Sequence, residues 1–286
     1  MRATVIIALF VLLACLALPA RADQSVIVQA EGYSCMGDDK SRSQTRADAL
    51  TDAKRKAADQ AGTYVVSETS VKDYITEKDV IDAYARATVK ILEELESRWS
   101  KDSTAGECYH LRVKAEVIPD EQAMQARADT GRDPMDDPSG PLTVDVWTDS
   151  EAYRAGDRMK VFLKGNKPFY ARVVYRDAQG TLVQLLPNAH RTAHYFNGGT
   201  VYEIPAGRDA FTLEVTPPFG KETVTVYAGT RPLGDLDMQD AGGVYLVRDG
   251  ADAVGVKTRG VMITHEAGPS GVAEFVESNR AVTTRP

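Results

Sequence analysis

The chain has 286 residues, of which 43% are hydrophobic and 26% are charged, and its formal net charge is -7. This composition is typical of a globular protein and excludes a disordered or collagen-like chain. The acidic balance argues against a nucleic-acid-binding protein, because binding to phosphates needs clustered Lys and Arg. The length favours two modest domains over one.

Residues 1–22 have the three-part pattern of a secretory signal peptide. A short positive region at Arg2 precedes an apolar stretch, and an A-x-A motif ends at Ala22. Cleavage before Asp23 would release the mature chain into the periplasm. The apolar stretch also contains Leu-Leu-Ala-Cys, which resembles a lipobox, and acylation at Cys15 would instead give an outer-membrane lipoprotein. The periplasmic interpretation is preferred, and the lipoprotein is the alternative.

Two cysteines remain after residue 22, and we expect them to form a disulfide. One pair of cysteines in an oxidising compartment is most simply bridged. Residues 25–35 and 108–117 both alternate like strands, so antiparallel pairing would bring Cys35 beside Cys108. A metal site is the less favoured interpretation, because neither cysteine lies in a C-x-x-C motif and structural zinc usually takes four ligands.

The strongest helix pattern covers residues 41–62. Either Ser41 or Ser43 is a suitable N-cap, and Gly62 is suited to the position after the helix. The stripe expected to face the sheet comprises small and apolar residues: Ala47, Leu50, Ala53, Ala57 and Ala61.

The segment between this helix and Cys108 is harder to interpret. The β-branched residues of 63–71 predict a strand, and Thr76 is placed to cap a second helix. Residues 88–99 suit either a long helix or a strand, and the strand is preferred because it supplies a hairpin partner for residues 108–117.

The N-terminal region resembles one envelope family. The residues that carry the resemblance are Ala30-Glu31-Gly32, Asp52-Ala53-Lys54-Arg55, Val66-Ser67-Glu68-Thr69 and the stretch 111–117. Together they are similar to the N-terminal domain of flagellar assembly protein T and to related small outer-membrane lipoproteins. The resemblance covers about residues 25–118. It implies a small α+β domain that serves assembly or scaffolding. The strands and helices predicted above give this domain a three-stranded antiparallel sheet and two helices.

Residues 119–141 are expected to link this domain, residues 23–118, to a second one. Their second half is rich in Pro, Asp and Gly and is typical of a connector. From residue 142 to the end, short apolar stretches separated by turn residues predict an all-β sandwich or jelly roll. The predicted strands cover residues 142–148, 158–164, 170–175, 182–186, 201–204, 210–215, 221–228, 244–247, 255–263 and 272–276.

This second region resembles domain of unknown function family 4384. The residues that carry the resemblance include Val146-Trp147-Thr148-Asp149, Tyr153-Arg154-Ala155-Gly156-Asp157, Leu185-Leu186-Pro187-Asn188, Pro217-Pro218-Phe219-Gly220 and Lys257-Thr258-Arg259-Gly260. The match covers nearly all of residues 142–283. It implies an accessory module of exported proteins and supplies no ligand or reaction.

No motif of a hydrolase, nucleotide-binding site or zinc protease occurs in the sequence. The His190/His194 pair has metal-like spacing but no third ligand nearby, and the acidic stretch Asp235–Asp240 lacks the spacing of a calcium-binding loop. We therefore expect no catalytic residue, metal or cofactor.

Four aromatic residues of the second region, Trp147, Phe162, Phe169 and Tyr170, are expected in its core. The alternative for Trp147 is a surface that stacks on sugars, for which Trp147 and Tyr153 would both need to be exposed. The sequence thus predicts a non-enzymatic periplasmic protein that scaffolds or binds another envelope protein, and a carbohydrate- or peptidoglycan-binding accessory protein is the alternative.

Overall fold

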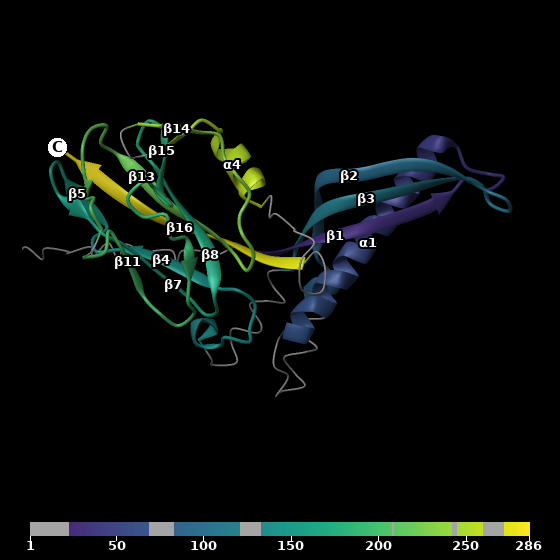
Figure 1. Cartoon of the computed structure of the whole chain (residues 1–286), viewed down its shortest axis with the longest axis horizontal. Helices are drawn as coiled ribbons and strands as arrows, with labels where there is room; N and C mark the ends of the chain where they lie inside the picture. Colours follow the sequence, from purple (N-terminus) through teal and green to yellow (C-terminus); the bar gives the residue numbers. More distant parts are fainter. Residues whose placement is uncertain (1–22, 69–82, 121–132, 208, 242–244, 260–271) are drawn as a thin grey trace, which may run out of the picture.

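The computed structural model describes residues 23–68, 83–120, 133–207, 209–241, 245–259 and 272–286. It is rich in antiparallel β structure, with few helices (Figure 1). The predicted signal peptide, including Cys15 and Ala22, lies outside these residues. So do most of the predicted second helix, with Thr76, and most of the predicted linker.

The elements run along the chain in the following order. They are β1 (Asp23–Cys35), α1 (Arg42–Glu68), β2 (Thr88–Asp102), β3 (Gly106–Ile118), η1 (Pro134–Asp136), β4 (Val144–Thr148), β5 (Ala152–Arg154), β6 (Arg158–Met159), β7 (Val161–Gly165), β8 (Phe169–Arg176) and β9 (Leu182–Leu186). They continue with β10 (Tyr195–Phe196), β11 (Tyr202–Ile204), β12 (Leu213–Glu214), β13 (Lys221–Gly229), β14 (Met238–Asp240), β15 (Tyr245–Val247), α4 (Ala251–Thr258) and β16 (Val272–Arg285).

One large sheet runs through the whole molecule. Its strand order is β14-β15-β9-β8-β13-β16-β1-β3-β2, with β10 and β5 attached beside β8 and β16. The last strand, β16, lies between β13 and β1 and pairs antiparallel with both. Strands β1–β3 are therefore not the separate three-stranded sheet that the sequence predicted, because β1 continues the sheet into β16.

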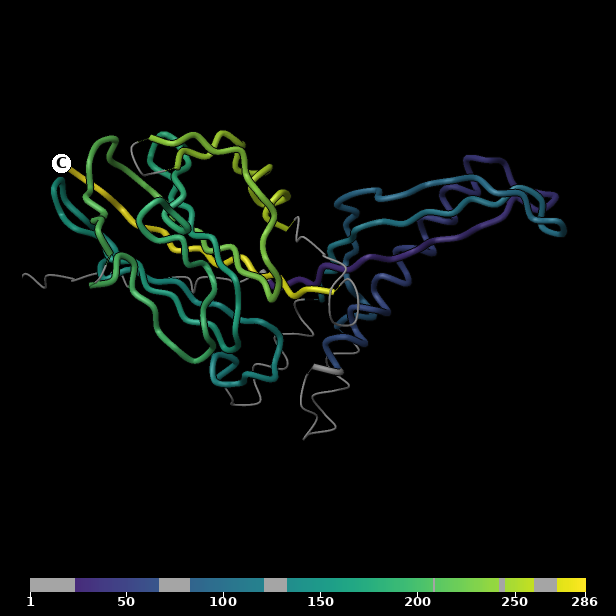
Figure 2. Tube along the Cα trace, in the orientation of Figure 1, coloured from purple at the N-terminus to yellow at the C-terminus, as the bar shows by residue number. Residues whose placement is uncertain are grey.

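We call α1 and β1–β3 the arm and the remaining elements the body. In Figure 1 the arm extends to one side, with α1 lying along one face of its strands. The trace in Figure 2 shows the yellow strand β16 running from the base of the arm to the far end of the body.

Helix α1 begins with a capping box. The Ser41 hydroxyl accepts from the Gln44 backbone N–H at 3.3 Å, while the Gln44 amide oxygen accepts from the Ser41 N–H at 2.8 Å. Of the two predicted caps, Ser41 is thus the one the helix uses.

The buried stripe of α1 differs from the predicted one at its first turn. Ala47 is exposed, and the stripe instead consists of residues four apart: Thr45, Ala49, Ala53, Ala57, Ala61 and Val65. The stripe does not stop at Gly62, and the helix continues to Glu68 through part of the segment predicted as a strand. The β-branched residue Val65 is helical because it is buried in the same cluster as Ala61, so that tertiary packing overrides local preference.

The helix lies very close to β1. A Cβ atom at Gly32 would lie 1.9 Å from the Ala49 carbonyl oxygen and 2.8 Å from the Ala53 Cβ. Only a glycine in the strand and alanines in the helix allow this approach.

The strand alternative for residues 88–99 is confirmed. Strand β2 forms a hairpin with β3, with register shifts at Leu92 and Leu95. The predicted disulfide is confirmed as well. Cys35 and Cys108 are directly paired in the β1–β3 register, and their sulfur atoms are bonded.

The body has two layers of strands. The three-stranded sheet β11-β7-β4 packs its apolar side chains, such as Val146 and Leu163, against Val173, Val226 and others of the large sheet. Residues 255–258, the start of a predicted strand, are helical instead, and residues 260–263 of that prediction lie outside the described residues. Helix α4 covers residues 251–258 there, because Val254 and Thr258, four residues apart, are both buried.

We predict that Gly32→Ala destabilises the protein by about 3 kcal/mol, because the added methyl group would overlap helix α1. Urea unfolding of the purified protein measures the change. Gly207→Ala is the matched control, since no atom lies within 4 Å of a Cβ at that position. Equal stability of the two variants would contradict the close approach of α1 to β1.

Candidate functional site

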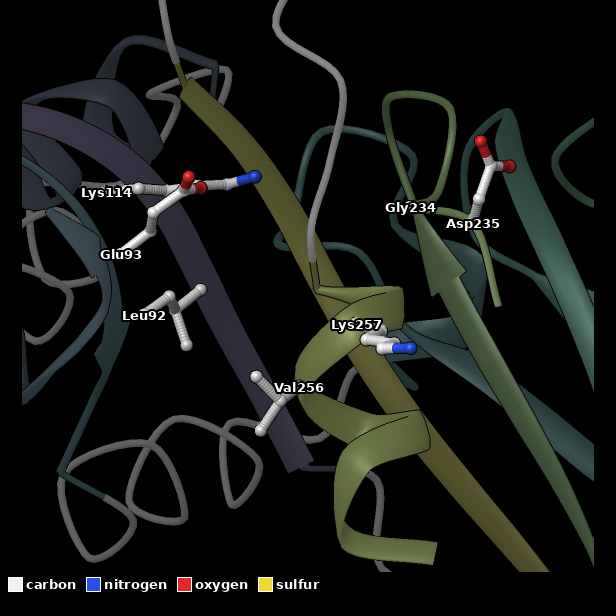
Figure 3. Close-up of a pocket in the computed structure, with 7 residues that line it drawn as sticks. All are labelled: Leu92, Glu93, Lys114, Gly234, Asp235, Val256 and Lys257. Carbon is white, nitrogen blue, oxygen red and sulfur yellow. The ribbon is translucent and has the colours of Figure 1, made fainter. Parts of the chain in front are cut away.

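An open groove of about 340 Å³ lies where the arm meets the body (Figure 3). Leu92, Glu93 and Lys114 line it from β2 and β3, while Gly234, Asp235, Val256 and Lys257 line it from the body. We call this the junction groove. In Figure 3 the side chains of Leu92 and Val256 point into the gap from opposite sides. Val256 is 52% exposed, although Val254 and Thr258 of the same short helix are buried.

A network of charged residues lies on the face of the sheet opposite α1, beside the groove. The Arg259 guanidinium, which follows α4, donates to the Glu116 carboxylate of the arm at 2.6 Å and to Glu277 of β16 at 3.2 Å. It also lies 4.8 Å above the centre of the Phe275 ring. Glu116 is 3% exposed and accepts a second bond from the Ser25 hydroxyl at 2.8 Å. Strands β1 and β3 and the residue that ends α4 therefore meet at one buried carboxylate, and Arg259 links it to β16.

Two further cations are buried near this network. Arg172 of β8 donates to the Gly234 carbonyl at 2.8 Å, and burial lowers its pKa while Asp235 opposes that change. Burial likewise lowers the pKa of Lys114, against the attraction of Glu93. In Figure 3 the side chains of Lys114 and Glu93 lie side by side on the arm wall. Lys257 is held at the body wall by Asp249, 2.6 Å away.

The junction groove thus has an apolar centre and two opposite charges, those of Lys114 and Glu93, on its arm wall. Such a surface suits an extended segment of a partner chain, with an apolar side chain between Leu92 and Val256 and backbone or polar groups beside Lys114 and Glu93. The seven lining residues include no Ser, Thr, Cys or His side chain.

The two residues proposed for sugar stacking do not share a surface. Trp147 lies on the outer face of the three-stranded sheet, half-buried and stacked on Phe162 with ring centres 5.7 Å apart. Tyr153 is only 3% exposed, and its hydroxyl donates to Asp149 at 2.7 Å and accepts from the Ser150 N–H at 3.0 Å.

The core prediction for the aromatic residues holds for only one of the four. Phe169 is fully buried, whereas Trp147, Phe162 and Tyr170 are half-buried. Their neighbours in β4, β7 and β8 fill the core, and alternation along a strand directs these three rings to the outer faces.

The two rings of the histidine pair contact different aromatic residues. The His190 ring stacks on Phe211, with centres 6.1 Å apart, while the His194 ring lies 5.7 Å from Tyr170. Within the described ranges, no group of three His, Cys, Asp or Glu side chains, including those of Asp235 and Asp237, is placed to hold a metal ion.

Sequence reasoning missed the Arg259–Glu116 network. A signal was present in β3, where Lys114 and Glu116 alternate with the apolar Val113, Ala115 and Val117. Two charges on the second face of a central strand suggest that charged partners cover that face. Their identity was not predictable, because Arg259 lies 143 positions away along the chain.

The fold is that of a mostly antiparallel β protein with a groove between its arm and its body. Within the body, residues 152–232 match the family described as domain of unknown function (DUF4384). This confirms the resemblance stated for the C-terminal region, over a shorter range than residues 142–283. The resemblance to flagellar assembly protein T remains a prediction. Comparisons with curated proteins and with solved structures find no match to the chain.

We predict that Arg259→Met destabilises the protein by about 3 kcal/mol, because it leaves the buried Glu116 carboxylate without its cation. Adding Glu116→Gln should restore more than half of the loss, since the neutral amide keeps an acceptor for Ser25. Urea unfolding of both variants and of Glu116→Gln alone completes a double-mutant cycle. Additive losses would show that the two side chains do not interact.

We also predict that stability falls as the pH rises from about 10 to 12. Burial and the bond to Asp149 raise the pKa of Tyr153 to about 12, and burial raises that of Tyr227 to about 12. Because a raised folded-state pKa means that folding favours the neutral phenol, the stabilisation is complete below pH 10 and disappears by pH 12. Unfolding measured at pH 9 and pH 11.5 tests this, and the difference should be smaller in Tyr153→Phe.

Proposed function

We propose that this protein is a non-enzymatic exported protein of the bacterial envelope that acts as a scaffolding or protein-interaction module in the periplasm. The observation that carries the proposal is the junction groove, which is lined by both arm and body and has an apolar centre open to solvent. A partner segment in this groove would contact both parts of the molecule at once.

The arm supports this proposal through its rigidity. The Cys35–Cys108 disulfide links β1 to β3, and α1 covers one face of the arm's strands. Backbone pairing of β1 with β16 joins these strands to the body. An arm held in this way keeps its wall of the groove in place before a partner binds, which lowers the entropy lost on binding.

Export is supported by the sequence of residues 1–22 and by the disulfide, which persists in oxidising compartments. No helix within the described ranges is long and apolar enough to span a bilayer. Acylation at Cys15 is the alternative mode of attachment, with the same folded part.

A photo-crosslinking residue at position 256 in the native cell tests the proposal. We expect one partner protein to be captured through the groove, and we expect its yield to fall when Glu93→Lys reverses a charge on the opposite wall. The intact mass of the purified chain should correspond to a start at Asp23, and a mass that includes acyl chains would support the lipoprotein instead.

Position 201 provides the matched control, because Val201 and Val256 are 54% and 52% exposed. The same proteins captured from both positions, or a yield that Glu93→Lys leaves unchanged, would rule out the groove as the interaction site. Recovery of the full-length chain in the cytoplasm alone would rule out the periplasmic function.

A further inference from the structure

A set of exposed aromatic side chains lies on the body, formed by strands other than those that line the junction groove. Tyr170 of β8 and Tyr195 of β10 are directly paired across the strands, with ring centres 4.9 Å apart and planes inclined by 59°. The His194 ring lies 5.7 Å from that of Tyr170. Tyr195 is 53% exposed, His194 is exposed and Tyr170 is half-buried. We call these three residues the aromatic patch.

The residues next to the patch along β8 and β10 anchor it to the hydrophobic core. The adjacent residues Phe169 and Phe196 point to the opposite face, where they are 0% and 2% exposed and stack with ring centres 5.4 Å apart. The Ala171 N–H also donates to the His194 carbonyl at 2.8 Å, and this bond attaches the segment before β10 to β8. The rings are therefore ordered before any ligand arrives, and little side-chain entropy is lost on binding.

The size of the patch decides which ligand it suits. A tyrosine or similar ring offers roughly 150–250 Å² when fully covered, so three partly covered rings expose a few hundred Å² at most. A stable protein interface needs about 800 Å² from each partner, and the flanking residues Thr192 and Asn197 are polar and exposed. The patch alone falls short of that area and is comparable in size to one or two sugar rings.

Polar atoms at the edge of the patch suit the same ligand. The His194 Nδ1 lies 3.0 Å from the Thr192 carbonyl oxygen, which can only accept, so Nδ1 donates in this bond and the second ring nitrogen, Nε2, takes no part in it. The phenol hydroxyl of Tyr195 both donates and accepts. Hydroxyl groups around a sugar ring could bond to these atoms while the apolar C–H face lies on the Tyr195 ring.

We propose that the aromatic patch is a carbohydrate-binding site that stacks a pyranose ring of a β-linked oligosaccharide on Tyr195. All-equatorial β-linked sugars present the flat C–H face that such stacking requires. The site goes beyond the proposed interaction function, because it attaches the body to a glycan while the junction groove remains available to a protein. It also replaces Trp147 and Tyr153 as the sugar-binding residues.

Saturation-transfer NMR on the full mature protein tests the site, with chitotetraose and cellotetraose as the probes. We expect transfer from the protein to at least one probe, strongest at the axial protons of one ring face. Tyr195→Ala should weaken binding at least tenfold, and Tyr195→Trp should retain it because the larger ring still stacks.

Tyr33→Ala is the matched control. Tyr33 is 44% exposed and lies beside a histidine ring, His110, with centres 4.6 Å apart, but it belongs to the arm. This variant should bind as the unchanged protein does. The proposal is overturned if neither probe shows transfer, or if Tyr195→Ala and Tyr33→Ala bind equally well. Cross-linking at position 256 is independent of these outcomes, so the two proposals fail separately.

Discussion

The pairing of β1 with β16 is the constraint on which the rest of the structure depends. Phe275 and Glu277 of β16 face Ser25 and Asp23 on one side, and β13 pairs with the same segment on the other. Because one strand is hydrogen-bonded to both neighbours, the arm and the body share a continuous backbone ladder. The junction groove has a fixed shape for this reason, and so does the charged network that crosses from Glu116 to Arg259.

The buried charges between the arm and the body contribute more to the relative position of these two parts than to the free energy of unfolding. Burying an ion pair costs desolvation energy that its attraction often only balances, and well-packed apolar groups of similar size can stabilise as much. A buried carboxylate with two partners, however, accepts only one arrangement of its neighbours. Glu116 thereby fixes where the residue that ends α4 lies against the arm, and with it the distance between the walls of the groove.

The alternation of apolar residues and the turn residues in the sequence predicted the disulfide and most strands of the body. Alternation in two segments was enough to pair Cys35 with Cys108, and the turn signals located most strands of the body. Errors arose where packing overrides preference, as at Val65, whose β-branched side chain lies in a helix. Residues 255–258 were predicted as a strand because a short apolar segment suits a helix as well as a strand. Only the burial of Val254 together with Thr258 distinguishes the helix from the strand.

The candidate sites were less predictable than the fold. The junction groove combines side chains from β2, β3 and α4, which only the β1–β16 pairing brings together, and no local pattern signals that contact. Tyr153 was a reasonable surface candidate by residue type, but its burial depends on the position of β5 beside β16. For the aromatic patch, the alternation of Phe169 with Tyr170 and of Tyr195 with Phe196 was visible, but their pairing was not.

The β1–β16 ladder also sets the order in which the molecule can be completed. Asp23 and Glu277 are partners although about 250 positions separate them. A ribosome must therefore finish almost the whole chain before the arm can dock on the body, and contacts so distant in sequence form slowly. Until then the strand edges of β1 and β13 that β16 will cover remain unpaired. A chain with this topology cannot form its complete sheet until its synthesis is almost finished.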